Sequence, residues 1–105
     1  MTTFDERKNA FENKFAHDEA MQFKAAARRN KLLGLWAAAL LGKSGADAEA
    51  YAMEVVQSDF AEVGHEDVVR KLVADLDYRA DEPTIRAKMG ELLSVAKAQV
   101  ADEIR

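Results

Sequence analysis

The sequence predicts an all-α protein, a four-helix bundle with a mobile, partly helical N-terminal arm. Apolar residues recur at three- and four-residue spacings along most of the chain, as in amphipathic helices, and no strand-like alternation of useful length is present. The 105 residues are 49% hydrophobic and include five Gly and only one Pro. This composition favours one small, folded, mainly helical domain over a disordered chain.

The N-terminal arm, residues 1–20, carries three aromatic rings on one helical face. Phe4, Phe11 and Phe15 are spaced seven and four residues apart, so they would form a line along an α-helix. Burying three Phe side chains contributes roughly 5–9 kcal/mol, whereas ordering the backbone of this segment costs roughly 20–40 kcal/mol. We therefore expect an arm that is disordered or frayed when free and helical on a partner.

Two alternatives concern the arm. The line of Phe side chains could fold back onto the bundle instead of binding a partner, and both states can coexist if a partner displaces the folded-back arm. His17, which lies among charged residues of the arm, is either a plain surface histidine or the source of a pH-dependent effect on arm binding.

The bundle, residues 21–105, is predicted to contain four helices joined by short turns. The first, at about residues 21–41, is apolar around most of its circumference, so we expect it to lie at the centre of the bundle. Gly42 suits the position that follows a helix C-terminus. The large apolar residues of this helix, Trp36 among them, are interpreted as core: Leu32, Leu33, Leu35, Trp36, Leu40 and Leu41.

Three further helices follow. One spans about residues 47–62, with Asp47 as its N-cap and Gly64 beyond its end. The next begins at residues 65–67, where acidic residues suit a helix N-terminus. The last, at about residues 83–103, begins after the start signal Asp81-Glu82-Pro83. Their predicted core positions are Ala48, Tyr51, Ala52, Val55, Val56, Phe60, Val68, Val69, Leu72, Val73, Leu76, Ile85, Met89, Leu92, Leu93, Ala96 and Val100.

The net charge of −4 conceals one basic stretch. Residues 20–46 contain five basic and no acidic residues, whereas the remainder contains nineteen acidic and ten basic ones. An acidic protein with one short basic stretch is a poor general ligand for nucleic acid, so no such partner is predicted. Arg28, Arg29 and Lys31 have two interpretations: a solvated helix face, or a contact for phosphates or for an acidic partner surface.

Cysteine usage and hydropathy bear on localisation. The chain has no Cys, which fits a reducing compartment. Its N-terminus is polar and shows no signal peptide. The longest apolar run, residues 32–41, would span only about 15 Å as a helix, half a bilayer. We expect a cytoplasmic protein without direct membrane insertion.

The residues that could carry catalysis are few. Gly42-Lys43-Ser44 resembles the end of a phosphate-binding loop, but Ala37 stands where that motif needs its earlier Gly, and a helix ends here instead of beginning. His17 and His65 lack metal-ligand spacing, and no Ser has a neighbouring base in sequence. We expect no enzyme, no metal site and no required cofactor.

Long runs of the sequence resemble the zeta subunit family, small ATPase inhibitors of the F-type ATP synthase of α-proteobacteria. The runs are KFAHD (14–18), FKA (23–25) and ARRNKLLGLWAA (27–38), followed by AEAYA (48–52), VV (55–56), DF (59–60), DV (67–68) and RK (70–71). The resemblance covers nearly the whole chain, although the last helix matches mostly by pattern. The family pattern has an acidic residue at position 61, where this chain has Ala61.

The resemblance implies a four-helix bundle with an inhibitory N-terminal region. That region would enter a catalytic α/β interface of the ATPase head, reach the rotating central stalk and block ATP hydrolysis while largely sparing synthesis. Weak adenine nucleotide binding in some relatives gives Arg28, Arg29 and Lys31 a second candidate role. The protein would be a monomer when free and peripheral at the inner membrane when bound to the synthase.

For this mechanism we predict an amphipathic helix in a groove of the partner. Phe4, Phe11 and Phe15 would be its anchors. The charged residues beside them would set its register: Arg7, Lys8, Glu12 and Lys14. Two other classes of function stay open, a nucleotide-sensing bundle that uses the basic patch and an adaptor whose arm binds a different protein.

Overall fold

The computed structural model describes residues 19–59 and 65–103, and within these ranges it is helical with no strand. In chain order the elements are α2 (Glu19–Leu40), α3 (Gly45–Ser58), α4 (Glu66–Leu76), the short 3₁₀ helix η1 (Asp77–Arg79) and α5 (Glu82–Glu103). The predicted all-α helical bundle is confirmed. The arm as far as residue 18 lies outside the described residues.

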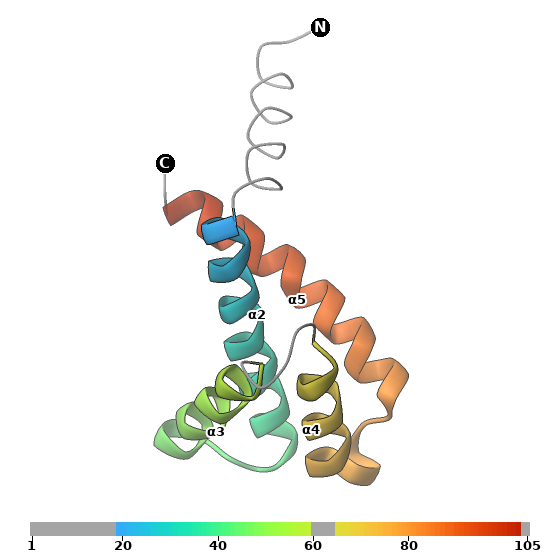
Figure 1. The fold of residues 1–105 in the computed structure, drawn as a ribbon. Coiled ribbons are helices and arrows are strands. Elements are labelled where there is room, and N and C mark those ends of the chain that lie inside the picture. Colours follow the sequence, from blue (N-terminus) through green and yellow to red (C-terminus); the bar gives the residue numbers. More distant parts are fainter. Residues whose placement is uncertain (1–18, 60–64, 104–105) are drawn as a thin grey trace, which may run out of the picture.

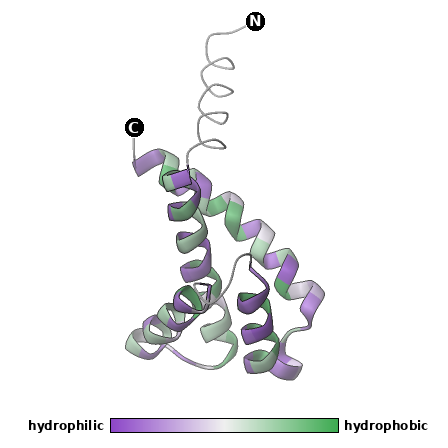
Figure 2. Ribbon diagram, in the orientation of Figure 1, coloured by the Kyte–Doolittle hydropathy of each residue, from purple (hydrophilic) through white to green (hydrophobic). Residues whose placement is uncertain are grey.

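Helix α2 is the central element of the bundle, as predicted. It contacts α3, α4 and α5, and α5 runs antiparallel to it, so that the first turns of α2 and the last turns of α5 lie at the same end of the molecule (Figure 1). Helices α3 and α4 flank the other half of α2. The hydropathy of α2 changes accordingly, from mixed turns near Glu19 to mostly hydrophobic turns towards Leu40 (Figure 2).

The residues that resemble a phosphate-binding loop, Gly42-Lys43-Ser44, form the turn between α2 and α3. The Lys43 amide donates to the Ala38 carbonyl at 2.9 Å and the Gly42 amide to the Ala39 carbonyl at 3.1 Å. These are the two bonds of a Schellman C-cap, which requires the positive φ of 78° found at Gly42. Gly42 therefore ends a helix, as predicted.

Two predicted features of α3 are wrong. Its N-cap position is Ser44, with extended backbone, and Asp47 lies within the first turn, because the compact Schellman turn lets the helix begin at Gly45. It ends at Ser58 instead of continuing to residue 62. Asp59 is the C-cap residue: its amide donates to the Val56 carbonyl, three residues back, and its side chain bonds to residues outside α3.

The main core forms where α2, α3, α4 and α5 converge. Its fully buried members are Leu33, Ala37, Ala38, Val55, Val68, Leu72, Leu76 and Ile85. Trp36 is half-buried and packs against this core, with the Lys88 ammonium 5.9 Å from its ring centroid. Val73 and Leu40 are about two-fifths exposed, at 39% and 40%. For these two the predicted burial is wrong, because each lies partly on a side of its helix that no other described helix covers.

Gly34 sets the distance between α2 and α3. A Cβ placed on Gly34 would lie 2.6 Å from the Ala52 Cα and 3.2 Å from the Ala52 and Val55 Cβ atoms. The first of these atoms is backbone and cannot rotate away. The two helices therefore pack at a separation that only glycine at position 34 permits.

We expect Gly34→Ala to destabilise the bundle by about 2 kcal/mol, because the added methyl overpacks a helix contact. Gly90→Ala is the matched control: Gly90 also lies inside a helix, and a Cβ there meets nothing within 4 Å. That control should stabilise by about 0.5–1 kcal/mol through helix propensity. Urea titrations of both variants provide the measurement, and equal effects of the two substitutions would contradict the tight contact.

Helix α5 begins as its sequence signal predicts. The Asp81 carboxylate accepts a hydrogen bond from the Thr84 backbone amide at 2.9 Å, and Pro83 occupies the first turn. Hydrogen bonds from Thr84 hold the pKa of Asp81 below its usual range. This cap fixes the start of α5, the longest of the helices that contact α2.

Candidate functional site

The predicted partner-binding residues divide between the arm and the bundle. The arm residues lie outside the described part of the chain: Phe4, Arg7, Lys8, Phe11, Glu12, Lys14, Phe15 and the neighbouring His17. Their roles stay predictions. The structure does describe where the arm joins the bundle, which is the first turn of α2.

The first turns of α2 pack on the last turns of α5 through a small apolar cluster. Met21 and Ala25 on α2 meet Val100 on α5, and these three residues form a buried group separate from the main core. Their exposed fractions are 9%, 1% and 0%. The root of the arm is thus held by α5 rather than by the centre of the bundle.

Charged side chains border this cluster. The Arg28 guanidinium donates from Nη1 to the Gln99 Oε1 at 3.0 Å and from Nη2 to the Glu103 Oε1 at 2.5 Å. The Lys24 Nζ lies 3.9 Å from the other oxygen of Glu103. Because Lys24 and Arg28 are four residues apart on α2, and Gln99 and Glu103 four apart on α5, two facing helix surfaces are joined.

Arg28, Arg29 and Lys31 do not share one surface. Arg28 faces α5, as described above. Arg29 is buried, with an exposed fraction of 3%, so for this residue the interpretation as a solvated face is wrong. Lys31 is exposed, 3.9 Å from the Glu49 carboxylate of α3. A contact of these three cations with adenine nucleotide stays a prediction.

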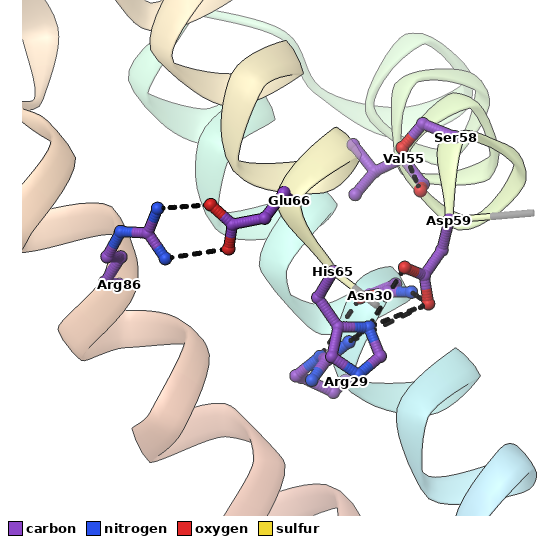
Figure 3. Close-up of polar contacts among 8 residues, drawn as sticks. All are labelled: Arg29, Asn30, Val55, Ser58, Asp59, His65, Glu66 and Arg86. Atoms are coloured by element: carbon purple, nitrogen blue, oxygen red, sulfur yellow. Dashed lines mark hydrogen bonds and ion pairs between the residues drawn. The ribbon is translucent and has the colours of Figure 1, made fainter. Parts of the chain in front are cut away.

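Arg29 belongs to a polar cluster that joins α2 to the end of α3 and the start of α4 (Figure 3). Its Nε donates to the Asn30 Oδ1 at 3.0 Å, and the Asn30 Nδ2 donates to the Asp59 Oδ2 at 2.9 Å. The Arg29 Nη2 lies 3.0 Å from the His65 Nδ1 and 3.9 Å from the Asp59 Oδ2. Residues 59 and 65, which flank the segment 60–64, are thereby fixed to α2.

The electrostatics of this cluster follow from burial. Burial lowers the pKa of Arg29, and the Asp59 carboxylate opposes this effect, so the guanidinium stays charged in a poorly solvated site. The His65 Nδ1 also lies 3.0 Å from the Asp59 Oδ1. One ring nitrogen therefore meets both a permanent donor and a carboxylate acceptor, and whether Nδ1 carries a hydrogen, which depends on the tautomer, decides which of the two contacts is a hydrogen bond.

Sequence reasoning missed this cluster because it treated His65 as isolated and Arg29 as part of a basic patch. One signal could have indicated it. Arg29 continues the four-residue spacing of Met21, Ala25, Leu33 and Ala37, all of which are buried. A cation on an apolar stripe requires a polar partner from another element.

A second polar group lies between α3 and α4. The Tyr51 hydroxyl donates to the Asp75 Oδ2 at 2.8 Å, and the Lys71 ammonium donates to the same oxygen at 2.9 Å. Burial and Asp75 raise the pKa of the Tyr51 hydroxyl, which therefore stays a donor at neutral pH. These residues line an open hollow of about 340 Å³ together with Leu41, Lys43 and Glu54. Its two lysines and two carboxylates balance in charge, so it has no preference for an anion.

The charged form of Asp75 stabilises the folded state, so the stability of the fold should depend on pH in the acid range. Burial favours its neutral form, but hydrogen bonds from Lys71 and Tyr51 outweigh this, so the pKa of Asp75 lies below its usual range. Because the folded-state pKa is the lower one, this stabilisation is present above the unfolded-state pKa of about 4 and is lost as pH falls through the folded-state value.

We expect Asp75→Asn to lower the free energy of unfolding by about 1 kcal/mol at pH 7. The difference from the unsubstituted protein should shrink as pH falls below about 4 and through the lower folded-state pKa, because both chains then become neutral at this position. Urea titrations at several pH values between 3 and 7 measure it. A difference that is the same at pH 3 and pH 7 would contradict the role of the charged form.

Neither a metal centre nor a membrane span is found in the described ranges. Residues 19–59 and 65–103 contain no group of three or more His, Cys, Asp or Glu side chains placed to hold a metal ion. Within the same ranges no helix combines the length and the apolar character needed to cross a bilayer.

The fold and this site define a small all-α protein in which a packed bundle holds the root of an N-terminal segment. The family model of the ATPase inhibitor subunit zeta matches residues 1–99. The chain belongs to this family, a family of ATPase inhibitors.

A solved structure supports the fold independently. A solution NMR structure is 63% identical in sequence, with a TM-score of 0.74, and the match covers 79% of this chain and 98% of that one. A comparison with curated proteins finds no match.

Proposed function

We propose that this protein inhibits ATP hydrolysis by the F-type ATP synthase by inserting its N-terminal arm into a catalytic α/β interface. There the arm would contact the central stalk and block rotation in the hydrolytic direction. The observation that carries the proposal is the extent of the family match, residues 1–99, which includes the arm and the bundle together. ATPase inhibition in general follows from the family, and the insertion mechanism is our proposal.

The line of Phe side chains supports an insertion mechanism. A helix with Phe4, Phe11 and Phe15 on one face offers three bulky anchors of the kind that dominates helix-in-groove binding. The surrounding charged residues, Arg7, Lys8, Glu12 and Lys14, would lie at the rim, where they tune the rate of approach and the specificity more than the affinity. The protein would act as a cytoplasmic monomer that joins the synthase at the inner membrane.

The bundle gives the arm a folded point of attachment. It is folded through its own core and joins the arm through α2, whose first turns are packed on α5. In the complex the bundle would remain outside the interface, limit how deeply the arm enters and add contacts of its own.

The anchors can be tested with full-length variants on the isolated ATPase head. Replacing both Phe11 and Phe15 by Ala should raise the concentration for half-maximal inhibition roughly 100- to 1,000-fold, because each substitution removes a large buried ring. The matched control replaces Glu12 and Lys14 by Gln and should change potency by about tenfold or less. Wild-type potency of the Phe variant would show that the aromatic line is not the anchor.

A further inference from the structure

We propose that the last two turns of α5 keep the first turns of α2 helical, a contact that we call the splint. Within it, Arg28 and Glu103 are positioning residues for the inhibitory arm. This inference rests on the proposed function, because it concerns how the arm is presented. Its first part, the ordering of α2 by α5, can be tested on the free protein without any ATPase.

The apolar part of the splint is small and local. Met21 and Ala25 bury against Val100, whereas the residues that fix α2 in the main core begin at Leu33. A helix end held by so few apolar contacts opens more readily than the core of the same protein. The order of the first turns of α2 therefore depends on what α5 adds to this cluster.

The polar part of the splint is Glu103. Acidic side chains near a helix C-terminus are disfavoured by the helix dipole, and the last turn of α5 contains no basic residue. Here the Glu103 carboxylate receives the Arg28 guanidinium and lies near the Lys24 ammonium. The two cations of α2 compensate an acid that α5 alone does not favour, so the pairing serves the contact between the helices.

An ordered start of α2 has a direct consequence for the arm. Beginning a helix costs the ordering of several residues for its first hydrogen bond, whereas lengthening an existing helix adds one bond for each residue ordered. An arm that becomes helical in a groove can therefore extend α2 towards the N-terminus without a new nucleation step. If α2 frays as far as Arg28, that advantage is lost and the direction in which the arm leaves the bundle is no longer fixed.

The test uses full-length charge variants. Arg28→Glu should increase amide hydrogen exchange of residues 20–27 roughly 3- to 10-fold relative to core amides such as those of Leu33 and Val55. Its concentration for half-maximal inhibition of the ATPase head should rise by a similar factor. The double variant Arg28→Glu with Glu103→Arg should restore both values, because it rebuilds the ion pair in reverse. Val100→Ala, which removes the apolar contact alone, should also increase exchange of residues 20–27.

The matched control is Arg86→Glu. Arg86 on α5 also pairs with an exposed glutamate of another helix, Glu66 of α4, at 2.7 and 3.0 Å, but away from the root of the arm (Figure 3). Arg86→Glu should leave the hydrogen exchange of residues 20–27 unchanged relative to core amides. It should also leave the concentration for half-maximal inhibition unchanged.

Unchanged exchange of residues 20–27 in Arg28→Glu and Val100→Ala would overturn the splint. Faster exchange with unchanged potency would overturn its role in positioning the arm. Failure of the proposed function is recognised separately, by an arm deletion that still inhibits.

Discussion

Deletion of residues 2–18 is expected to abolish inhibition of ATP hydrolysis while the bundle stays folded. The deletion removes all three predicted anchors, Phe4, Phe11 and Phe15, together with their charged neighbours. Among the described residues, Met21 and later residues form the buried clusters of the bundle, and we expect these clusters to hold without the deleted segment.

Two measurements on the deletion variant separate function from folding. Its rate of ATP hydrolysis in mixtures with the isolated ATPase head should equal that of the head alone. Its helical circular dichroism per bundle residue and its melting temperature should stay close to those of the full chain. Full inhibition by the truncated protein would rule out the arm as the inhibitory element, and loss of folding would show that the arm is part of the bundle.

Asp59→Ala is expected to cause the largest loss of stability of any single substitution considered for this bundle. Asp59 provides the carboxylate near Arg29, which is 3% exposed, and accepts a hydrogen bond from Asn30, which is 1% exposed. Its removal would leave a buried charge without its acidic partner and a buried amide donor without its acceptor. Such changes cost about 3–5 kcal/mol, a large fraction of the usual stability of about 5–15 kcal/mol for a folded protein.

The measurement is thermal unfolding, with a matched control on the same pair of helices. For a domain of this size each kcal/mol lowers the melting temperature by about 4–8 °C, so Asp59→Ala should lower it by at least about 12 °C. Glu49→Ala removes the exposed pairing with Lys31, also between α2 and α3, and should cost at most about 1 kcal/mol. If both variants melt within a few degrees of the unsubstituted protein, the Arg29 cluster does not stabilise the junction.

Much of the fold could be predicted because its signals are local. The helices follow from apolar spacing, Gly42 ends α2 through a Schellman turn, and Asp81 caps α5. These features depend on residues within one turn of each other. The wrong end of α3 has a different origin: the side chain of its C-cap residue, Asp59, bonds to Asn30, a residue distant in sequence.

The bundle part of the site was harder to predict because burial of a charge depends on tertiary neighbours. Arg28, Arg29 and Lys31 are close in sequence, yet they meet α5, the α3–α4 junction and the surface of α3 respectively. Gly34 likewise has no local signal, since its role depends on the approach of Ala52. The arm signal, in contrast, is contained in the spacing of its aromatic residues, and its use by a partner stays a prediction.

The wide difference in sequence separation among the contacts of α2 indicates an order of folding. Gly34 and Ala52 meet across 18 residues, whereas Arg28 and Glu103 are separated by 75. Closing a long loop costs more chain entropy than closing a short one, so the α2–α3 hairpin is expected to form early and the pairing with the end of α5 late. During synthesis the same order is imposed more strictly, because Glu103, in the last turn of α5, is made after α2, α3 and α4. A newly made chain would therefore acquire a fixed arm root only after α5 has been made.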